Sequence, residues 1–267
     1  MKRLVWLTDL HLEFVSSDDQ MNDLCERIKG EEPDCILIGG DTGIANSVEQ
    51  YLLDLENRLQ IPIYFVLGNH DFYHGSIEDV RRKIERLSNK KEQLHWLPVT
   101  GVVKLSANTA LIGHDGWADG RLGNGIKSKV ELNDYRLIKE LKGTDIIKRF
   151  KKLNELGDEA AEYFQKILPQ ALKEYSNIFL LTHVPPFKNA CTYRGRITDD
   201  EYLPHFSCKN VGDVLTKIMK EQPKCNLTVL CGHTHGKADA KILSNLYVKV
   251  GGAEYGKPKI QAVIEIE

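Results

Sequence analysis

The sequence of 267 residues has no long apolar run, no internal repeat and no low-complexity tract. No segment reaches the roughly 18 consecutive apolar residues that suffice to cross a bilayer, so we expect neither a membrane span nor a membrane partner. The apolar stretch after Arg3 ends at Leu7 and is too short for the core of a signal peptide. These absences predict a cytoplasmic location.

The sequence also has no marked excess of charge of either sign. Its 36 Lys and Arg residues nearly balance its 38 Asp and Glu residues, which leaves a formal net charge of −2. Such a balance gives no long-range attraction to a polyanion, so a nucleic-acid partner is not favoured. None of the six cysteines forms a CxxC pair, and Cys35 and Cys231 lie in apolar runs. We therefore expect reduced, mostly buried thiols.

Short apolar runs alternate with longer segments of helical periodicity, which is typical of a layered α/β fold. Strands are expected at residues 3–8, 34–39, 61–67, 102–105, 109–113, 177–182, 226–231, 246–250 and 260–266. Helices are expected at residues 18–29, 47–59, 76–87, 155–175 and 211–221, with Pro169 kinking or ending the fourth. We expect a single domain over residues 1–267, with an irregular helical excursion over about 116–175.

Five of the apolar runs end in residues that bind metals or move protons: Asp9 and His11; Asp41; Asn69, His70 and Asp71; His183; and His233 and His235. In layered α/β folds the carboxyl ends of strands open onto the crevice where ligands bind. Side chains two apart on an extended segment point to the same side, so each Asp-x-His or His-x-His pair can reach one ion or two adjacent ions.

Imidazole, carboxylate and amide oxygen without thiolate form a mixed donor set that suits Mn, Fe, Zn or Co. Seven ligands are too many for one ion, whereas two ions about 3.5 to 4 Å apart that share Asp41 would use them all. Taken singly, the motifs have ordinary alternatives, because Asp and His also cap strands and Gly39-Gly40-Asp41 also suits a turn. Their combination in one chain favours a metal site.

These motifs resemble the series found in calcineurin-like metallophosphoesterases: Asp9-x-His11, Gly40-Asp41, Gly68-Asn69-His70-Asp71, His183-x-Pro185 and Gly232-His233-x-His235. The resemblance spans residues 9 to 235 and implies a four-layer α/β/β/α sandwich of two mixed β-sheets flanked by helices. It also implies two metal sites: one made by Asp9, His11, Asp41 and His235, and one made by Asp41, Asn69, His183 and His233.

The same resemblance implies hydrolysis of phosphate mono- or diesters of a small phosphorylated substrate by attack of a metal-bridging hydroxide. The cofactors would be two divalent ions, with Mn favoured and Fe, Zn, Co or Ni also compatible. His70 would be a catalytic residue and not a ligand, placed to protonate the departing oxygen or to stabilise the pentacovalent phosphorus. The neighbouring Asp71 would fix the tautomer of His70 and favour its imidazolium form.

Departures from the family pattern narrow the choice of branch. After Asp41 the chain continues Thr42-Gly43-Ile44, without the second acidic residue and the arginine of Ser/Thr protein phosphatases and without the tyrosine ligand of purple acid phosphatases. The substrate stays open among monoesters, diesters, cyclic nucleotides and nucleotide anhydrides, because those differences reside in loops; substrate-binding residues and oligomeric state stay open as well.

Two other functions also stay open. One is a catalytically silent scaffold for protein binding, which the complete ligand set and His70 disfavour. The other is a nuclease, which the basic stretch 127–152 would serve as a phosphate-facing wall. Acidic residues interleave with the basic ones in that stretch, and this pattern favours a solvated helical face.

Three groups of residues lie near the motifs without an assigned role: Phe72, Tyr73 and His74; His114 and Trp117; and Tyr193, Arg194 and Arg196. Aromatic residues of the first group can stack on a nucleobase, with ordinary packing as the alternative. For His114, a structural histidine bonded to backbone is favoured over a position at the rim. The arginines of the third group can grip a phosphate, although exposed arginines rarely do.

Overall fold

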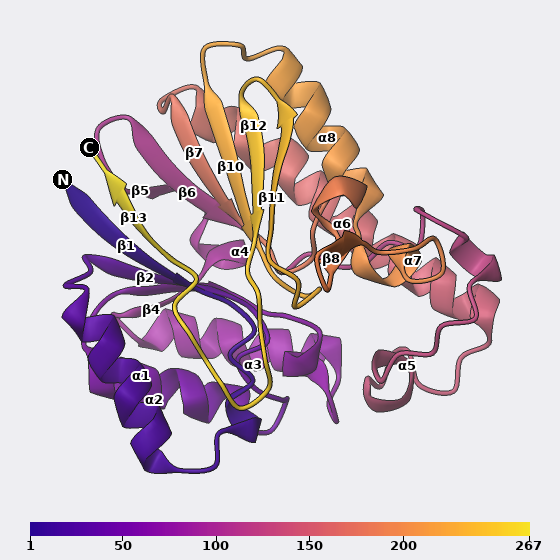
Figure 1. The fold of residues 1–267 in the computed structure, drawn as a ribbon, viewed down its shortest axis with the longest axis horizontal. Coiled ribbons are helices and arrows are strands. Elements are labelled where there is room, and N and C mark those ends of the chain that lie inside the picture. Colours follow the sequence, from indigo (N-terminus) through magenta and orange to yellow (C-terminus); the bar gives the residue numbers. More distant parts are fainter.

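The computed structural model describes all 267 residues and contains two β-sheets between two layers of helices (Figure 1). The first sheet has the order β13 (Ala262–Ile266), β1 (Lys2–Leu7), β2 (Cys35–Gly39), β3 (Ile63–Val66) and β4 (Leu94–Trp96). Strands β1 to β4 are parallel, and β13 pairs with β1 in the antiparallel sense.

The second sheet has six strands: β11 (Ala238–Leu243), β12 (Leu246–Val250), β10 (Asn226–Cys231), β7 (Asn177–Leu181), β6 (Thr109–Gly113) and β5 (Val103–Lys104). Its four central strands are parallel, and the edge strands β11 and β5 are antiparallel to their neighbours. Both sheets are therefore mixed, as the family resemblance implied.

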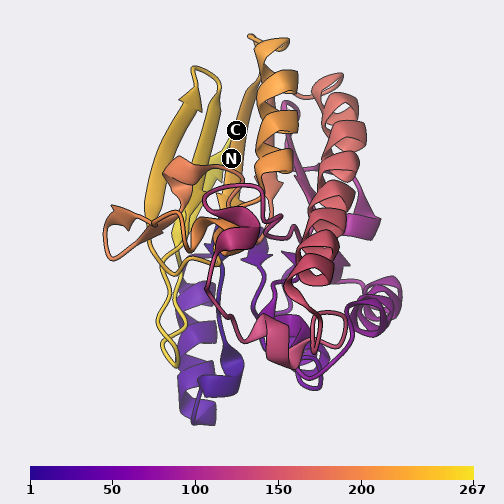
Figure 2. The same ribbon diagram turned by 90° about the vertical axis from the view of Figure 1, so that its right-hand side faces the viewer.

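Helices cover the outer face of each sheet. The first sheet is covered by α1 (Asp18–Gly30), α2 (Val48–Leu59) and α3 (Ile77–Lys90). The second is covered by α6 (Ile146–Leu172) and α8 (Lys209–Lys220), which lie side by side (Figure 2). The short helices are α4 (Leu97–Thr100), α5 (Asp134–Leu137) and α7 (Leu203–Phe206). None of the helices combines the length and the apolar character needed to cross a bilayer.

Three hydrophobic clusters fill the spaces between the four layers. Along β1, Val5 packs towards the first helical layer, whereas Leu4 and Trp6 pack between the two sheets. Along β7, Leu180 packs towards the second helical layer and Leu181 packs between the sheets. Because successive strand residues point to opposite faces, strands buried on both faces must be apolar throughout. This explains the uninterrupted apolar runs and confirms the expected four-layer sandwich.

The sequence prediction missed four strands, namely β4, β11 and the two-residue strands β8 (Thr192–Tyr193) and β9 (Arg196–Ile197), and it misjudged one helix. Strands β4 and β11 were not expected, because β4 has only three residues and β11 carries Asp239 and Lys241 at solvated positions. Helix α6 begins at Ile146, well before the expected residue 155, and continues past Pro169 to Leu172. All six cysteines are free, and only Cys225 is not buried, as expected.

His114 is a buried structural histidine, as favoured from the sequence. It is 5% exposed, and its Nδ1 accepts a hydrogen bond from the Gly116 amide at 3.1 Å. Burial, together with the positive charge of Arg81, lowers the pKa of His114 to about 3. The folded protein therefore holds this imidazole neutral at pH values where the unfolded chain, with an ordinary histidine pKa near 6.5, binds a proton.

Acid should consequently destabilise the fold through His114. Because the unfolded state alone takes up this proton below pH 6.5, stability should fall as the pH is lowered from 6.5 towards 3. Between pH 7 and pH 5 the loss should be about 2 kcal/mol. Urea unfolding at both pH values in the presence of a chelator measures this loss of unfolding free energy. The variant His114→Asn cannot take up this proton, so its loss should be smaller than that of the wild type by about 2 kcal/mol. Equal losses in both proteins would contradict the assignment.

Candidate metal centre

The carboxyl ends of five strands meet at one edge of the sandwich and carry the residues that the motifs single out. They follow β1 (Asp9 and His11), β2 (Asp41), β3 (Asn69 and His70), β7 (His183) and β10 (His233 and His235). The first three strands belong to one sheet and the last two to the other. The site therefore exists only because the two sheets pack against each other.

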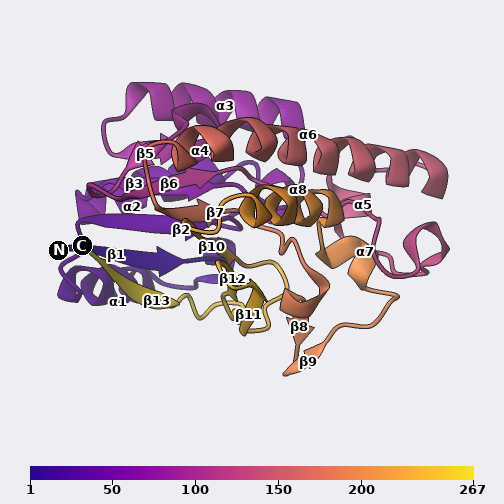
Figure 3. The same ribbon diagram turned by 90° about the horizontal axis from the view of Figure 1, so that it is seen from above.

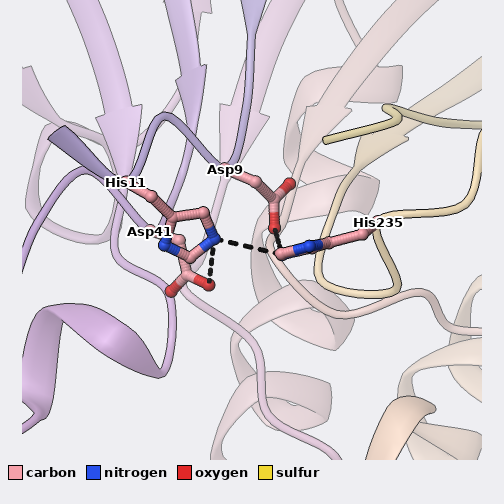
Figure 4. A group of neighbouring side chains, drawn as sticks. All are labelled: Asp9, His11, Asp41 and His235. Carbon is pink, nitrogen blue, oxygen red and sulfur yellow. Dashed lines mark hydrogen bonds and ion pairs between the residues drawn. The ribbon is translucent and has the colours of Figure 1, made fainter. Parts of the chain in front are cut away.

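The first group of converging side chains is Asp9, His11, Asp41 and His235, shown in Figure 4. One potential ligand atom from each lies within 4.8 Å of the others. The two imidazole Nε2 atoms of His11 and His235 are 3.0 Å apart, and His11 Nε2 is 3.7 Å from Asp41 Oδ2. His235 Nε2 is 3.6 Å from Asp9 Oδ1. These are the four residues that the resemblance implied for one ion.

The second group is formed by Asp41, Asn69, His183 and His233. His183 Nε2 lies 3.3 Å from Asp41 Oδ2 and 3.1 Å from Asn69 Oδ1. His233 Nδ1 lies 2.9 Å from the same Asn69 oxygen. Asp41 Oδ2 is thus within 4 Å of imidazole nitrogens of both groups, the place that a shared carboxylate would occupy.

The donor set fits two divalent cations. Asp41 Oδ2 is buried and accepts no hydrogen bond, although a buried carboxylate oxygen is costly to leave unpaired. Burial by itself would raise the pKa of the Asp41 carboxyl, but the neighbouring imidazoles of His183, His70 and His11 hold it well below its usual range. An ionised carboxylate with a free lone pair facing imidazole nitrogens is suited to hold cations.

Hydrogen bonds to the far sides of the ligands set which atom faces the centre. His183 Nδ1 donates to the Gly39 carbonyl at 2.8 Å, which leaves Nε2 as the ligand atom. His233 Nε2 donates to the His205 carbonyl at 3.0 Å, which leaves Nδ1. Thr8 Oγ1 donates to Asp9 Oδ2 at 2.7 Å. These hydrogen bonds therefore fix the orientation of the two rings and the nitrogen that each turns towards the centre.

The backbone at the ligands is not extended. Asp9, His11, Asp41, His233 and His235 all adopt left-handed conformations, with φ of 51°, 44°, 51°, 69° and 57°. Asp9 and His11 converge as expected, but the expected cause, the alternation of side chains along an extended strand, was wrong. The chain turns sharply at each of these five residues, and strain of this kind persists only where the surrounding structure enforces it.

Two glycines of the motifs leave room for the ligand carboxylates. A Cβ atom at Gly232 would lie 1.9 Å from Asp9 Oδ2, and one at Gly68 would lie 2.2 Å from Asp41 Oδ1. Any larger residue at either place would displace a ligand carboxylate. The glycines in Gly68-Asn69-His70-Asp71 and Gly232-His233-x-His235 are thus required by close approach to the ligands.

His70 lies beside both groups without belonging to either. Its backbone amide donates to Asp41 Oδ1 at 2.8 Å, and its ring stacks on Tyr73 with centroids 4.1 Å apart. Burial lowers the pKa of His70, but the carboxylates of Asp41, Glu13 and Asp134 more than reverse this effect, so the net shift is upwards. These carboxylates therefore stabilise the imidazolium form of His70 relative to a free histidine.

The carboxylate that faces His70 is Glu13, not the expected Asp71. Glu13 Oε1 lies 3.7 Å from His70 Nδ1 and 3.6 Å from His11 Nδ1. Burial would raise the pKa of Glu13, but contacts with these two imidazoles bring it down to about 2. Asp71 instead accepts the backbone amides of Gly43 and Gly68, each at 2.8 Å, and so fixes the loops that carry Asp41 and Asn69.

Sequence reasoning also missed Asp134, which lies at the start of α5 in the excursion. Its Oδ1 accepts hydrogen bonds from Asn69 Nδ2 at 2.9 Å and from the Tyr73 hydroxyl at 2.7 Å. The first bond turns the amide oxygen of Asn69 towards His183 and His233. No local pattern marks Asp134 or Glu13, because each meets the site only through tertiary packing.

Removing the Asp134 carboxylate should weaken the second group selectively. In Asp134→Ala the Asn69 amide loses the partner that orients it, so the affinity for the cation there should fall about 10- to 100-fold. The first group makes no contact with Asp134 and should keep its ion. Metal titration by calorimetry measures both affinities, with Asp134→Asn, which keeps an acceptor oxygen, as the control. Equal weakening of both sites would contradict this role.

A cavity of ≈ 780 Å³ opens beside the metal centre and is lined by Asp41, Asn69, His70, His233 and His235 among others. Its remaining walls come from segments beyond the strand ends: residues 132–134, the hairpin of β8 (Thr192–Tyr193) and β9 (Arg196–Ile197), and α7. Figure 3 shows the hairpin, α5 and α7 on this side of the molecule.

The structure places the residues near the motifs that had no assigned role in two environments, the cavity wall and the core. Tyr73, Tyr193 and Arg196 line the cavity. Phe72 and Trp117 are buried and pack against each other, with ring centroids 5.6 Å apart. The sequence did not distinguish these two environments because both contain aromatic residues just after strands.

The basic stretch 127–152 contributes no Lys or Arg to the cavity wall; the residues that it places there are Leu132, Asn133 and Asp134. Three of its cations form ion pairs with acids: Lys148 with Asp145, Arg149 with Glu131 at 2.6 Å, and Lys152 with Glu155. The guanidinium of Arg149 also stacks over the Tyr135 ring. This arrangement agrees with a solvated helical face better than with a phosphate-facing wall.

Comparison with known proteins gives a consistent result. Residues 2–237 match the sequence pattern of the calcineurin-like phosphoesterase family (Metallophos). An uncharacterized metallophosphoesterase of Helicobacter pylori strain J99 is 36% identical over 76 residues, which are 27% of this chain and 20% of that protein. One of Campylobacter jejuni is 28% identical over 112 residues, or 39% and 30% of the two chains. These matches span less than a third of the relatives' length.

Solved structures share the fold at low sequence identity. The phosphopantetheinyl hydrolase of Mycobacterium tuberculosis superposes with a TM-score of 0.67 at 15% identity, covering 95% of this chain and 90% of that one. A dimetal phosphatase from Danio rerio superposes with a TM-score of 0.59 at 13% identity, covering 94% and 87%. The likeness therefore extends over nearly the whole sandwich.

Proposed function

Because this chain belongs to the calcineurin-like phosphoesterase family, we propose that it hydrolyses phosphate mono- or diesters of a small phosphorylated substrate with two divalent cations. The observation that carries the proposal is the orphaned Asp41 Oδ2, which lies between two groups of ligands that converge at the cavity. Manganese is the favoured metal, with Fe, Zn, Co or Ni compatible with the same donors.

In this proposal each side chain has a separate task. One cation would be held by Asp9, His11 and His235. The other would be held by Asn69, His183 and His233, and Asp41 would bind both. Bound cations would polarise the phosphoryl group and make a water acidic enough to attack it at neutral pH.

The proton needed by the departing oxygen would come from His70. Glu13 faces Nδ1 of His70, which lines the cavity, so Nε2 would be the nitrogen that hands over a proton. Stacking on Tyr73 holds the ring in place, and the neighbouring carboxylate of Glu13 favours its protonated form. No covalent enzyme intermediate is required.

The test is hydrolysis of p-nitrophenyl phosphate and of bis-p-nitrophenyl phosphate by protein stripped with chelator and refilled separately with Mn, Fe, Zn, Co or Ni. Turnover that depends on the metal is expected, and the ratio of the two rates separates a monoesterase from a diesterase. Two bound ions per chain without turnover of any phosphoester would refute the proposal in favour of a scaffold. Preferred cleavage of DNA or RNA with a steep salt dependence would instead identify a nuclease.

A further inference from the structure

The exposed aromatic side chains of this protein are gathered around the cavity. Of all its Phe, Trp and Tyr residues only Phe14, Tyr193, Tyr202 and Tyr255 are exposed, by 45% to 56%. The three tyrosines line the cavity, and Phe14 packs on Tyr255 with ring centroids 4.8 Å apart. Aromatic surface left open to water at one place marks a site of contact with a ligand or partner.

These aromatics form walls on two sides of the metal centre. Tyr255 lies over the first group, with its ring centroid 4.6 Å from that of His11 and 5.1 Å from that of His235. Phe206 lies over the second group, 4.9 Å from the His233 ring, and Tyr202 continues this wall at 6.0 Å from Phe206. A planar group attached to a phosphate at the metals would meet an aromatic face on either side.

The size and the charge of the cavity further restrict the kinds of ligand that fit it. A volume of ≈ 780 Å³ is that of a pocket for a drug-sized organic molecule, far more than a phosphate ion fills. Arg196 is the only Lys or Arg in the lining, which also contains the carboxylates of Asp134 and Asp199. A chain of phosphates would require several cations beyond the metal centre. The cavity suits one phosphoryl group and a large, planar, weakly charged organic part.

We propose that this site takes phosphoesters whose organic part carries an aromatic or heteroaromatic ring and is about the size of a nucleoside. The proposal rests on the proposed function, because it names the substrate class of the same metal centre. The ring stacks on the aromatic walls while the phosphoryl group lies at the metals. Stacking on aromatic side chains tolerates many ring types, so the preference is for a class and not for one base.

The test compares adenosine 5′-monophosphate with ribose 5-phosphate, which share the phosphoryl group and the leaving alcohol and differ in the ring. Calorimetry on metal-loaded protein gives both dissociation constants, and kcat/KM is measured wherever turnover occurs. We expect the ring-bearing compound to bind at least about 10-fold more tightly, since stacking on one aromatic side chain changes binding about 5- to 150-fold. Equal binding would overturn the proposal.

Substitutions in the aromatic walls test whether these side chains cause the preference for a ring-bearing phosphoester. In Tyr255→Leu and Phe206→Leu the ratio of the two dissociation constants should fall towards one, whereas Tyr255→Phe, which keeps the ring, should preserve the ratio. Tyr247→Leu, which removes an aromatic residue outside the cavity, is the matched control, and metal content is measured for each variant. A ratio unchanged in both Leu variants would overturn the role of the walls. Because binding is measured directly, a protein without turnover would refute the proposed function and still test this inference.

Discussion

Replacing Asp41 with asparagine should remove both metal sites at once and abolish hydrolysis. The substitution keeps the size of the side chain and its Oδ1 acceptor for the His70 amide, but it removes the negative charge that faces both ligand groups. Removing a residue that only hydrogen-bonds to a metal ligand already lowers the metal affinity about 10- to 100-fold. Losing the shared carboxylate should therefore weaken each site by about 100-fold or more.

Equilibrium dialysis followed by elemental analysis measures this loss, with two ions expected per wild-type chain and fewer than one per variant chain. Asp119→Asn is the matched control, because Asp119 is equally buried, accepts the Asn210 amide at 2.9 Å and belongs to neither group. The control should retain both ions. One ion fully retained by Asp41→Asn would show that Asp41 serves a single site.

Replacing His70 with alanine should separate catalysis from metal binding. The hydrogen bond of His70 to a ligand is made by its backbone amide to Asp41 Oδ1, which alanine retains; its ring only packs edge-on against the His11 ring. The imidazole, by contrast, is the group placed to protonate the departing oxygen, and loss of a general acid costs about 10²- to 10⁴-fold in rate. We expect both ions to stay bound while kcat falls within that range.

Metal content and kcat measured on the same preparation check this expectation. His74→Asn is a suitable control, because His74 is an exposed neighbour in a left-handed conformation that asparagine tolerates. It should turn over at close to the wild-type rate. Loss of the ions in His70→Ala would assign His70 to the ligand set instead, and a rate within a factor of a few of wild type would exclude it as the acid.

The alternation of apolar runs and helical segments was sufficient to predict a layered α/β fold, because strands buried on both faces are apolar throughout, whereas the sandwich of two sheets was implied by the family resemblance. Strands without such an apolar run were not predicted. Strand β4 is too short to show a pattern, and β11 has polar residues on its solvated face. Local periodicity identifies an element only when the element is long and one or both of its faces are buried.

The sequence by itself singled out the candidate metal ligands, since each follows directly on a buried strand and the residue types are those that bind divalent cations. Only the tertiary structure decided what holds these residues in place. Glu13 faces His70, Asp134 orients Asn69, and Asp71 supports two loops instead of the His70 ring. Such contacts join residues far apart in the chain or on sharp turns, and their chemistry depends on a geometry that no local pattern of residues records.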